Sequence, residues 1–367
     1  MKKIITLLLI SLLCLTCGKK ENNNIKIGVI LPLTGDVASY GISAKKGVEL
    51  CAQQINSNGG IKGQKLEIIF QDDKGEATEA TRIINSLISI NDVVAVIGSA
   101  GSSVTLAITP IANKKRIVLI SPISSSKKLT IDGGFYFFRT CPSDDQQAKI
   151  LAEWMFLSGY KTVGVLYTNN DWGSSLTNDF KYIFEGMGGK LVGSEASNES
   201  AKDFRIQLLK LKKVNPEAIF APTYPKEGGL LIKQAKEIGI KVQLFGADNW
   251  GAPEFLKIAG NSADGVLFTT PSAYKGKEYM NFEKQYEQKY NERPNVFSAY
   301  AFDALEALVT TMKDLETINS ENIATKLHDI KFQGVSNFIE FDKHGNLKTN
   351  AFSKNEIING EIKLLQK

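Results

Sequence analysis

The sequence predicts an α/β protein made of two lobes, each with a parallel-sheet core. The first observation is length, because 367 residues exceed the roughly 150 residues of an ordinary domain. The second is a regular alternation of short β-rich runs with segments of helical periodicity, which is typical of βαβ units. The third is that this alternation starts again after residue 140. Two consecutive α/β sets therefore predict two lobes.

The first set begins at residue 25, where an apolar β-rich run is followed by a helical stripe through Val48 and Ile55. Three further runs alternate with helices expected over about residues 78–89 and 103–114. The expected strands of this set are IKIGVILPL (25–33), KLEIIFQD (65–72), VVAVIG (93–98) and IVLIS (117–121). Buried parallel strands of this kind need helices on both faces of the sheet.

The second set follows a run at residues 135–140 and repeats the same order. Its expected strands are 162–168, a short one near Leu191, 217–222, 242–246 and 265–270, and its expected helices are about 148–155, 174–184, 204–211 and 231–238. The chain then turns helical, over 282–290 and 296–315, and ends in short strands near 338–341 and 351–365. Neither terminal piece is long enough to form a domain, so each is expected to complete one of the lobes.

The composition argues against several function classes. The 44 Lys and Arg against 39 Asp and Glu give a formal charge of +5, spread over short scattered pairs, so we expect no nucleic-acid partner. His328, His344 and the four cysteines lack the spacing of a metal site, and we expect neither a metal nor a cofactor. An SxxK at Ser124–Lys127 lacks the companion motifs of penicillin-recognising enzymes. No catalytic residue is expected, and the chain is not predicted to be an enzyme.

The first residues resemble an export signal. Residues 1–16 combine two lysines with an apolar run too short to span a bilayer of ~30 Å, which is typical of a signal peptide. Cys17 follows and resembles the acylated cysteine of bacterial lipoproteins, at the start of a polar tether over 17–24. The sequence therefore predicts an exported, membrane-anchored lipoprotein that faces the periplasm or the cell exterior. An ordinary secretory signal that leaves Cys17 as a free thiol is the alternative.

The two remaining cysteines carry little functional information. Cys51 lies on an apolar helical stripe and is expected in the core. An oxidising compartment permits a disulfide between Cys51 and Cys141, but the sequence does not require one.

Four loops that follow expected strands carry hydroxyl, amide, acidic or aromatic residues. Ligands of open α/β sheets bind beyond the carboxyl ends of the strands, so these loops, with Tyr40 and Tyr224, are candidates to line one crevice. The loops are Gly98–Ser103, Ser121–Ser125, Asn169–Gly173 and Gly246–Gly251. The first of them can offer backbone N–H groups and the start of a helix to an anion. The alternative is that Ser102 or Ser103 only caps that helix.

Several motifs in this order resemble a known family. They are LPLTGDVASYG (31–41), INSNGGIKGQKLEI (55–68), VIGSAGSS (96–103), LISPISSS (119–126), FFRTCPSDDQQ (137–147) and NNDWG (169–173). Together they resemble the type I periplasmic substrate-binding proteins, and specifically the leucine/isoleucine/valine-binding branch. The resemblance runs from about Ile25 to the C-terminus.

The resemblance implies how the chain is divided. It implies two Rossmann-like lobes joined by three crossings, near Cys141, Pro271 and Lys348. Lobe 1 would then contain residues 25–141 and 272–348, and lobe 2 would contain residues 142–271 and 349–367.

The resemblance also implies an α-amino acid in the cleft between the lobes. Its carboxylate would be held by Ser102 and by backbone and hydroxyl groups of Ile123 and Ser125. Its ammonium group would meet Asp248, and the aromatic walls would be Tyr40, Trp172 and Tyr224. The alternatives left open are that Trp172 and Tyr224 only pack the interior and that Asp248 is an acid of a surface turn. Ile123 is larger than the small residue often found at its position, which leaves the choice of ligand open.

The function implied by the resemblance is that of a monomeric receptor. It would capture an amino acid, with a branched-chain one favoured, and deliver it to an ABC permease in the cytoplasmic membrane. The same fold binding another small solute, such as another amino acid, an amide or an aromatic acid, for uptake or sensing, is the alternative.

Overall fold

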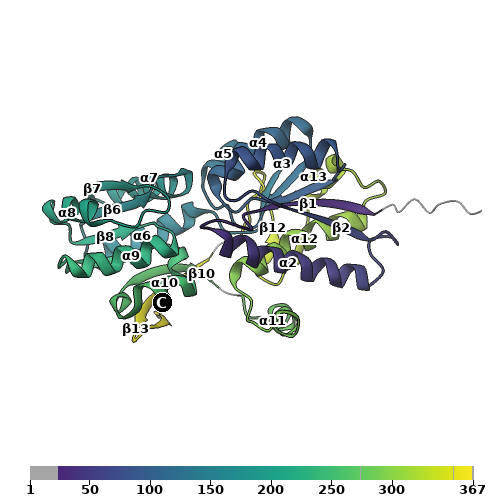
Figure 1. Ribbon diagram of the computed structural model, residues 1–367. Helices are drawn as coiled ribbons and strands as arrows, with labels where there is room; N and C mark the ends of the chain where they lie inside the picture. Colours follow the sequence, from purple (N-terminus) through teal and green to yellow (C-terminus); the bar gives the residue numbers. More distant parts are fainter. Residues whose placement is uncertain (1–23, 273, 350, 366–367) are drawn as a thin grey trace, which may run out of the picture.

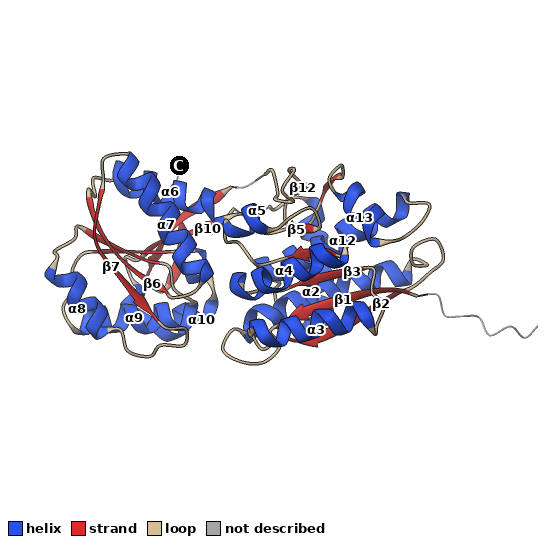
Figure 2. Ribbon diagram, turned by 90° about the horizontal axis from the view of Figure 1, so that it is seen from above, coloured by secondary structure: helices blue, strands red, loops and turns tan. Residues whose placement is uncertain are grey.

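The computed structural model shows two α/β lobes that lie side by side, as seen from two directions in Figures 1 and 2. It describes residues 24–272, 274–349 and 351–365. The predicted signal peptide (1–16), the lipidation site Cys17 and all but the last residue of the predicted tether lie outside the described residues. The fold class predicted from the alternation of strands and helices is confirmed.

Lobe 1 is built on a five-stranded sheet in which every neighbouring pair is parallel, in the order β2-β1-β3-β4-β5. Its strands are β1 (Ile25–Leu31), β2 (Leu66–Asp72), β3 (Ala95–Gly98), β4 (Val118–Ser121) and β5 (Phe137–Arg139). Because each strand returns to the same edge through a helix, the loops after β1, β3 and β4 all open at one end of the sheet.

Helices cover both faces of this sheet, as Figure 2 shows. They are α2 (Ala38–Ser57), α3 (Ala77–Ser89), α4 (Ser102–Lys115), α5 (Lys128–Asp132), α11 (Lys277–Tyr290), α12 (Val296–Asp314) and α13 (Ser320–Leu327). Val29 of β1 shares a hydrophobic cluster with Val48 of α2 and Leu305 of α12. Ile30, the next residue of β1, belongs instead to the cluster of α3 and α4. Alternate residues of β1 thus face opposite helix layers, which explains its continuous apolar run.

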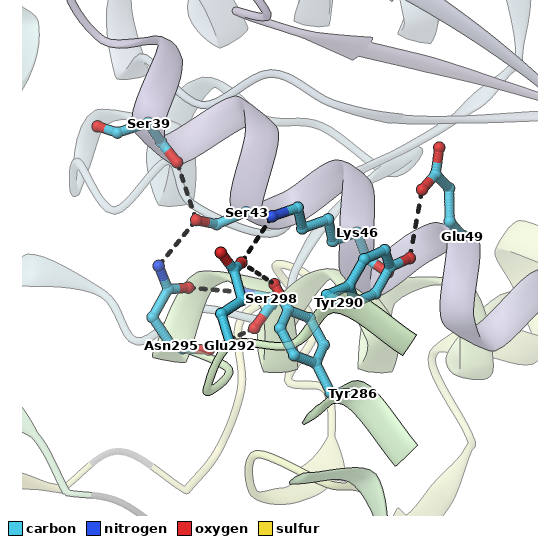
Figure 3. A network of polar contacts seen from close by, with 9 residues as sticks. All are labelled: Ser39, Ser43, Lys46, Glu49, Tyr286, Tyr290, Glu292, Asn295 and Ser298. Atoms are coloured by element: carbon cyan, nitrogen blue, oxygen red, sulfur yellow. Dashed lines mark hydrogen bonds and ion pairs between the residues drawn. The ribbon is translucent and has the colours of Figure 1, made fainter. Parts of the chain in front are cut away.

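The helix pair α2 and α12 joins the two distant parts of the chain that make lobe 1. Figure 3 shows the polar contacts that support this pairing: Lys46 pairs with Glu292 at 2.6 Å, and Tyr290 donates its hydroxyl to the Lys46 carbonyl at 3.0 Å. Asn295 caps α12 and donates to Ser43 at 2.8 Å. A Cβ at Gly47 would lie 2.0 Å from a backbone oxygen of α12, so the close approach needs glycine. The start of α12 is therefore fixed next to α2.

Lobe 2 contains a seven-stranded sheet in the order β14-β13-β10-β9-β8-β6-β7. Its strands are β6 (Thr162–Thr168), β7 (Lys190–Ser197), β8 (Ala218–Ala221), β9 (Gln243–Gly246), β10 (Leu267–Pro271), β13 (Phe352–Ile358) and β14 (Glu361–Leu364). Its helices are α6 (Asp144–Leu157), α7 (Asp171–Gly186), α8 (Arg205–Lys213), α9 (Pro225–Glu237) and α10 (Pro253–Ala259), with short 3-10 turns η1 (Asp248–Gly251) and η2 (Gly260–Ala263). Helices α6 and α7 pack on one face, and α8, α9 and α10 pack on the other.

The second sheet has the predicted parallel core, formed by β10, β9, β8, β6 and β7, and adds an antiparallel hairpin at one edge. β13 is antiparallel to β10 and to β14. The turn between β13 and β14 contains Asn359 and Gly360, with φ angles of 52° and 75°, which is the geometry of a tight hairpin. This short turn requires β13 and β14 to be antiparallel to each other, whereas the direction of β13 against β10 depends on where the chain re-enters lobe 2.

The terminal segments complete the two lobes as expected. Helices α11 to α13 and the small hairpin of β11 (Lys331–Gln333) and β12 (Phe338–Glu340) contribute to the lobe 1 cluster, and β13 joins the sheet of lobe 2. The chain passes between the lobes after β5, after β10 and after β12, close to the implied crossings; the boundaries themselves stay a prediction. Cys51 is buried in the lobe 1 cluster, as expected, and both it and Cys141 are free thiols.

Candidate ligand-binding site

A small cavity lies between the two lobes, beyond the carboxyl ends of both sets of strands. Its volume of about 50 Å³ is several times the ~10–15 Å³ that one water molecule needs, which suits a small solute. The structure brings all seven sequence-predicted site residues to its wall: Tyr40, Ser102, Ile123, Ser125, Trp172, Tyr224 and Asp248. Five more residues line it: Val37, Ala100, Gly101, Asn249 and Phe297. The contacts that a ligand makes with these residues stay a prediction.

The first helix turn of α4 supplies a positive end to the cavity. The N-cap of α4 is Gly101, and Ser102 and Ser103 are the first two residues inside the helix. The alternative that Ser102 or Ser103 caps the helix is therefore wrong. The Ser102 hydroxyl accepts a hydrogen bond from the Ser126 N–H at 3.2 Å. That leaves its own proton for a ligand, next to the helix start that carries partial positive charge. This end of the cavity suits a carboxylate.

The loop after β4 brings Ile123 and Ser125 to the cavity wall. The Ile123 N–H is directed at the Ser121 hydroxyl at 3.3 Å, and the Ser125 hydroxyl donates to Asp144 Oδ2 at 2.9 Å. The implied contact of a ligand carboxylate with backbone and hydroxyl groups of Ile123 and Ser125 stays a prediction.

Arg139, at the end of β5, holds this loop in place. It is fully buried and donates to the Ser126 carbonyl at 2.9 Å, to Thr130 Oγ1 at 2.6 Å and to Asn346 Oδ1 at 2.8 Å. Asn346 belongs to the segment that leads towards the third crossing. The loop that carries Ile123 and Ser125 is thus tied to the hinge region.

Asp248 supplies the negative end of the cavity from lobe 2. It is the first residue of η1, immediately beyond β9. Burial raises the pKa of Asp248 to about 6, and a hydrogen bond from Gln147 opposes that shift. A buried carboxylate of this kind is stabilised in its charged form by a cation. Its place on the cavity wall excludes the alternative of a surface turn acid.

Aromatic side chains close the remaining walls. The rings of Trp172 and Tyr224 stack with their centroids 5.1 Å apart and an interplanar angle of 13°. Tyr40 packs edge-on against Phe297 at 4.8 Å and donates its hydroxyl to Asn249 Oδ1 at 3.1 Å. Trp172 also belongs to the core cluster of lobe 2, so packing and lining are combined in one residue.

Direct contacts across the cleft hold the lobes together around the cavity. The bond from Tyr40 to Asn249 is one of them. Asp171, the first residue of α7, donates its N–H to Ser103 Oγ at 3.1 Å and pairs through its carboxylate with Lys128 at 2.5 Å. On another side of the cleft, Lys226 donates to the Asp36 carbonyl at 3.3 Å. These contacts join the two lobes directly on more than one side of the cavity.

A comparison with protein families decides the identity of this architecture. Residues 24–353 match the family described as periplasmic binding protein. The chain belongs to the periplasmic binding protein family. This match covers most of the chain and confirms the resemblance and the type I binding-protein fold.

Other proteins that this binding protein is similar to, some of them with solved structures, agree with that assignment. Leu/Ile/Val-binding protein homolog 3 of Brucella melitensis is 29% identical over 332 residues, 90% of each chain. The leucine-, isoleucine-, valine-, threonine-, and alanine-binding protein of Pseudomonas aeruginosa is 28% identical over 337 residues, 90% of this chain and 89% of that one. The branched-chain amino acid transporter substrate binding protein LivJ of Streptococcus pneumoniae, in complex with isoleucine, has a TM-score of 0.83 and 29% identity, over 94% of this chain and 99% of that one.

Sequence reasoning missed several residues that shape the site of this binding protein. Phe297 reaches the cavity from the start of α12, far along the chain from Tyr40, and no local pattern marks it. Asn249 lies beside Asp248 in a loop that was already a candidate, so its position could have been included. Asp144 lies in the quoted motif FFRTCPSDDQQ, but its bond to Ser125 becomes visible only in three dimensions.

Two further properties of the described residues bear on the site. No group of three or more His, Cys, Asp or Glu side chains among them is arranged to hold a metal ion. In the same part of the chain, no helix is both long and apolar enough to cross a membrane.

Proposed function

We propose that this binding protein captures an α-amino acid, and most favourably a branched-chain one, in the cavity between its lobes. The observation that carries the proposal is the pairing of opposite ends in one small cavity: the start of α4 with Ser102 on lobe 1, and the carboxylate of Asp248 on lobe 2. A zwitterion needs hydrogen-bond donors at one end and an acid at the other. The names of the relatives support this choice of ligand.

The energetics of such a site are sufficient for capture from dilute solution. Charge-assisted hydrogen bonds contribute about 1.5–3 kcal/mol each, and an aromatic face near an ammonium group adds about 0.5–2 kcal/mol. After the costs of ordering, several such contacts reach the roughly −8 kcal/mol of micromolar binding.

Binding would favour the closed arrangement of the lobes. Because Ser102 belongs to lobe 1 and Asp248 to lobe 2, a ligand that contacts both stabilises closure by its differential affinity for that state. We infer that the closed, loaded protein acts as a monomer and delivers the amino acid to an ABC permease in the cytoplasmic membrane for import. No covalent step is needed for this function.

In this proposal the protein is exported and acts outside the cytoplasm. Membership of a periplasmic binding protein family supports export. Attachment through an acylated Cys17 rests on the sequence alone, since residues 1–23 lie outside the described part of the chain.

A thermal-melt screen of the ligand-stripped protein without its signal peptide tests the ligand. Leucine, isoleucine or valine at 100 times its dissociation constant is expected to stabilise the folded state by about 2.7 kcal/mol, which raises the melting temperature. Amides and aromatic acids are the comparison arms, together with the other common amino acids. If no amino acid changed the melting temperature and another solute raised it, the proposed ligand would be contradicted.

Ser102→Ala is expected to weaken leucine binding about 10-fold in calorimetry. The substitution removes one donor to the ligand carboxylate, and a hydrogen bond to a charged group contributes about 1.5–3 kcal/mol. The Ser126 N–H also loses its acceptor, which lowers the stability of the fold rather than the affinity. Ser89→Ala, at an exposed position at the end of α3, is the matched control and should bind like the wild type. Wild-type affinity in Ser102→Ala would show that the start of α4 does not hold the carboxylate.

A further inference from the structure

Two pairs of opposite charges join the lobes outside the cavity. Lys127 and Lys128 lie at the start of α5 on lobe 1, and Figures 1 and 2 show α7 of lobe 2 opposite this helix. Lys127 Nζ lies 3.2 Å from Asp179 Oδ1 of α7. Lys128 Nζ lies 2.5 Å from Asp171 Oδ1, at the start of the same helix. None of these four side chains lines the cavity.

Asp179 receives its counter-charge from the other lobe. Burial raises the pKa of Asp179, and the charge of Asp145 on α6 adds to that rise, whereas Lys127 lowers it. Asp179 Oδ2 is buried and has no hydrogen-bond partner in the described part of the chain. A half-buried carboxylate near a like charge is costly unless a cation lies close to it. Contact between the lobes supplies that cation.

The pairs between α5 and α7 differ from the other ion pairs of the described residues. Most of those others lie within one lobe, as Lys210 and Glu195 do at 2.9 Å in lobe 2, so a movement of the lobes does not separate them. A third pair that joins the lobes, Lys226 with Asp36, is longer at 3.8 Å. The closest charge contacts between the lobes are therefore those of α5 with α7, among the residues that the structure describes.

We propose that Lys127 and Lys128 form an electrostatic latch with α7, which stabilises the lobes in contact with each other and strengthens the binding of every ligand by the same factor. The latch does not touch the ligand, so it acts only on the equilibrium between joined and separated lobes. The apparent affinity for any ligand rises with the fraction of protein in the binding-competent arrangement. This inference goes beyond the proposed function, because the latch does not depend on which solute is bound.

Two other roles of these lysines predict different behaviour. Many exposed ion pairs contribute nothing measurable, and a pair that stays intact when the lobes separate would leave the affinity unchanged. A direct role in recognition of the ligand would change the preference between ligands. The latch predicts a uniform loss of affinity, which is restored whenever opposite charges again face each other.

An exchange of charges tests the latch at Lys127 and Asp179. Leucine affinity is measured by calorimetry at low salt for the wild type, Lys127→Asp, Asp179→Lys and the variant with both changes. Each single variant places like charges opposite each other and is expected to bind about 10-fold more weakly. The double variant restores opposite charges and should bind within about 2-fold of the wild type. Single variants with wild-type affinity, or losses that multiply in the double variant, would overturn the proposal.

Lys127→Met keeps the test usable if a reversed charge disturbs folding. Lys127 is exposed, and methionine keeps much of its stem without the charge. This variant is expected to bind leucine, isoleucine and valine about 3-fold more weakly, all alike. Lys210→Met, which removes one charge of the pair inside lobe 2, is the matched control and should bind like the wild type. A changed preference among the three ligands, or an equal loss in Lys210→Met, would contradict the latch.

Salt gives a second readout that a role in folding alone would not move. Leucine has no net charge, and a rise from about 0.01 M to about 1 M salt shortens the screening length from about 30 Å to about 3 Å. The affinity of the wild type is expected to fall about 3-fold over this range, because exposed pairs are screened. The variant with both Lys127→Met and Lys128→Met should respond much less. Equal salt dependence of the two proteins would count against the proposal.

The latch and the proposed ligand fail in different ways. If the wild type binds another solute and no amino acid, the proposed ligand is wrong, and the same exchange of charges is measured with that solute. If the wild type binds leucine and the double variant does not regain affinity, only the latch is wrong.

Discussion

Asp248→Asn is expected to weaken leucine binding by about 100-fold or more. Truncating one partner of a buried, hydrogen-bonded charge pair costs about 2–5 kcal/mol, because the other charge is left unpaired in a dry site. Asparagine keeps the size and one acceptor oxygen of the side chain but lacks the charge that the ligand ammonium group needs. Calorimetry of the purified variant at pH 7.5 measures the loss.

The same substitution is expected to raise the melting temperature of the unliganded protein at pH 7.5. The pKa of Asp248 is raised by burial from an ordinary 3.8 to about 6. A raised pKa in the folded state means that the protonated form is favoured there, so stability is highest below about pH 4 and is lost as the pH rises through 6. At pH 7.5 the wild type carries this unfavourable charge, and the variant does not.

Measurements at two pH values check the sign of this effect. The stability advantage of Asp248→Asn should be present at pH 7.5 and nearly absent at pH 4. Leucine affinity of the wild type should fall as the pH drops below 6, because the carboxylate becomes neutral. Asp92→Asn, an exposed acid before β3, is the control and should show neither effect. A variant that binds leucine like the wild type would show that Asp248 does not meet the ammonium group.

The fold was predictable where each element could be recognised from its own residues. β1 is recognisable as a strand because its residues are apolar on both faces. α3 is recognisable as a helix because Ile83, Ile84 and Leu87 lie on one helical stripe. The antiparallel course of β13 was not predictable in the same way. Its direction depends on where the chain re-enters lobe 2, which is a long-range property that local periodicity does not contain.

The site was predictable in its residues more than in its hydrogen bonds. Residues that follow strand ends, such as Ser102 and Asp248, reach the cavity because the sheet geometry places them there. Phe297 reaches it only because α12 packs against α2, where Lys46 of α2 pairs with Glu292 just before α12 begins. The Ser125 hydroxyl bonds to an acid of the other lobe, Asp144, and no spacing in the sequence specifies that partner.

Trp172→Ala is expected to weaken leucine binding by about 10- to 100-fold and also to lower the melting temperature. The ring lines the cavity and supports Tyr224 by stacking at 5.1 Å, so its removal opens the aromatic wall to water and lets Tyr224 move. The ring is also 95% buried within the lobe 2 cluster, and truncating such a residue typically costs about 3–5 kcal/mol of folding stability. Both losses are measurable on one preparation, by calorimetry and by thermal melting.

Trp154→Ala separates the two contributions, because Trp154 belongs to the same cluster but does not line the cavity. It packs edge-on against Phe245 with ring centroids 5.3 Å apart. This control should lose stability to a similar extent and keep wild-type affinity for leucine. If Trp154→Ala loses affinity as well, then general loosening of lobe 2 explains the effect of Trp172→Ala. If only Trp172→Ala does, the stacked pair of Trp172 and Tyr224 acts as a wall of the ligand site.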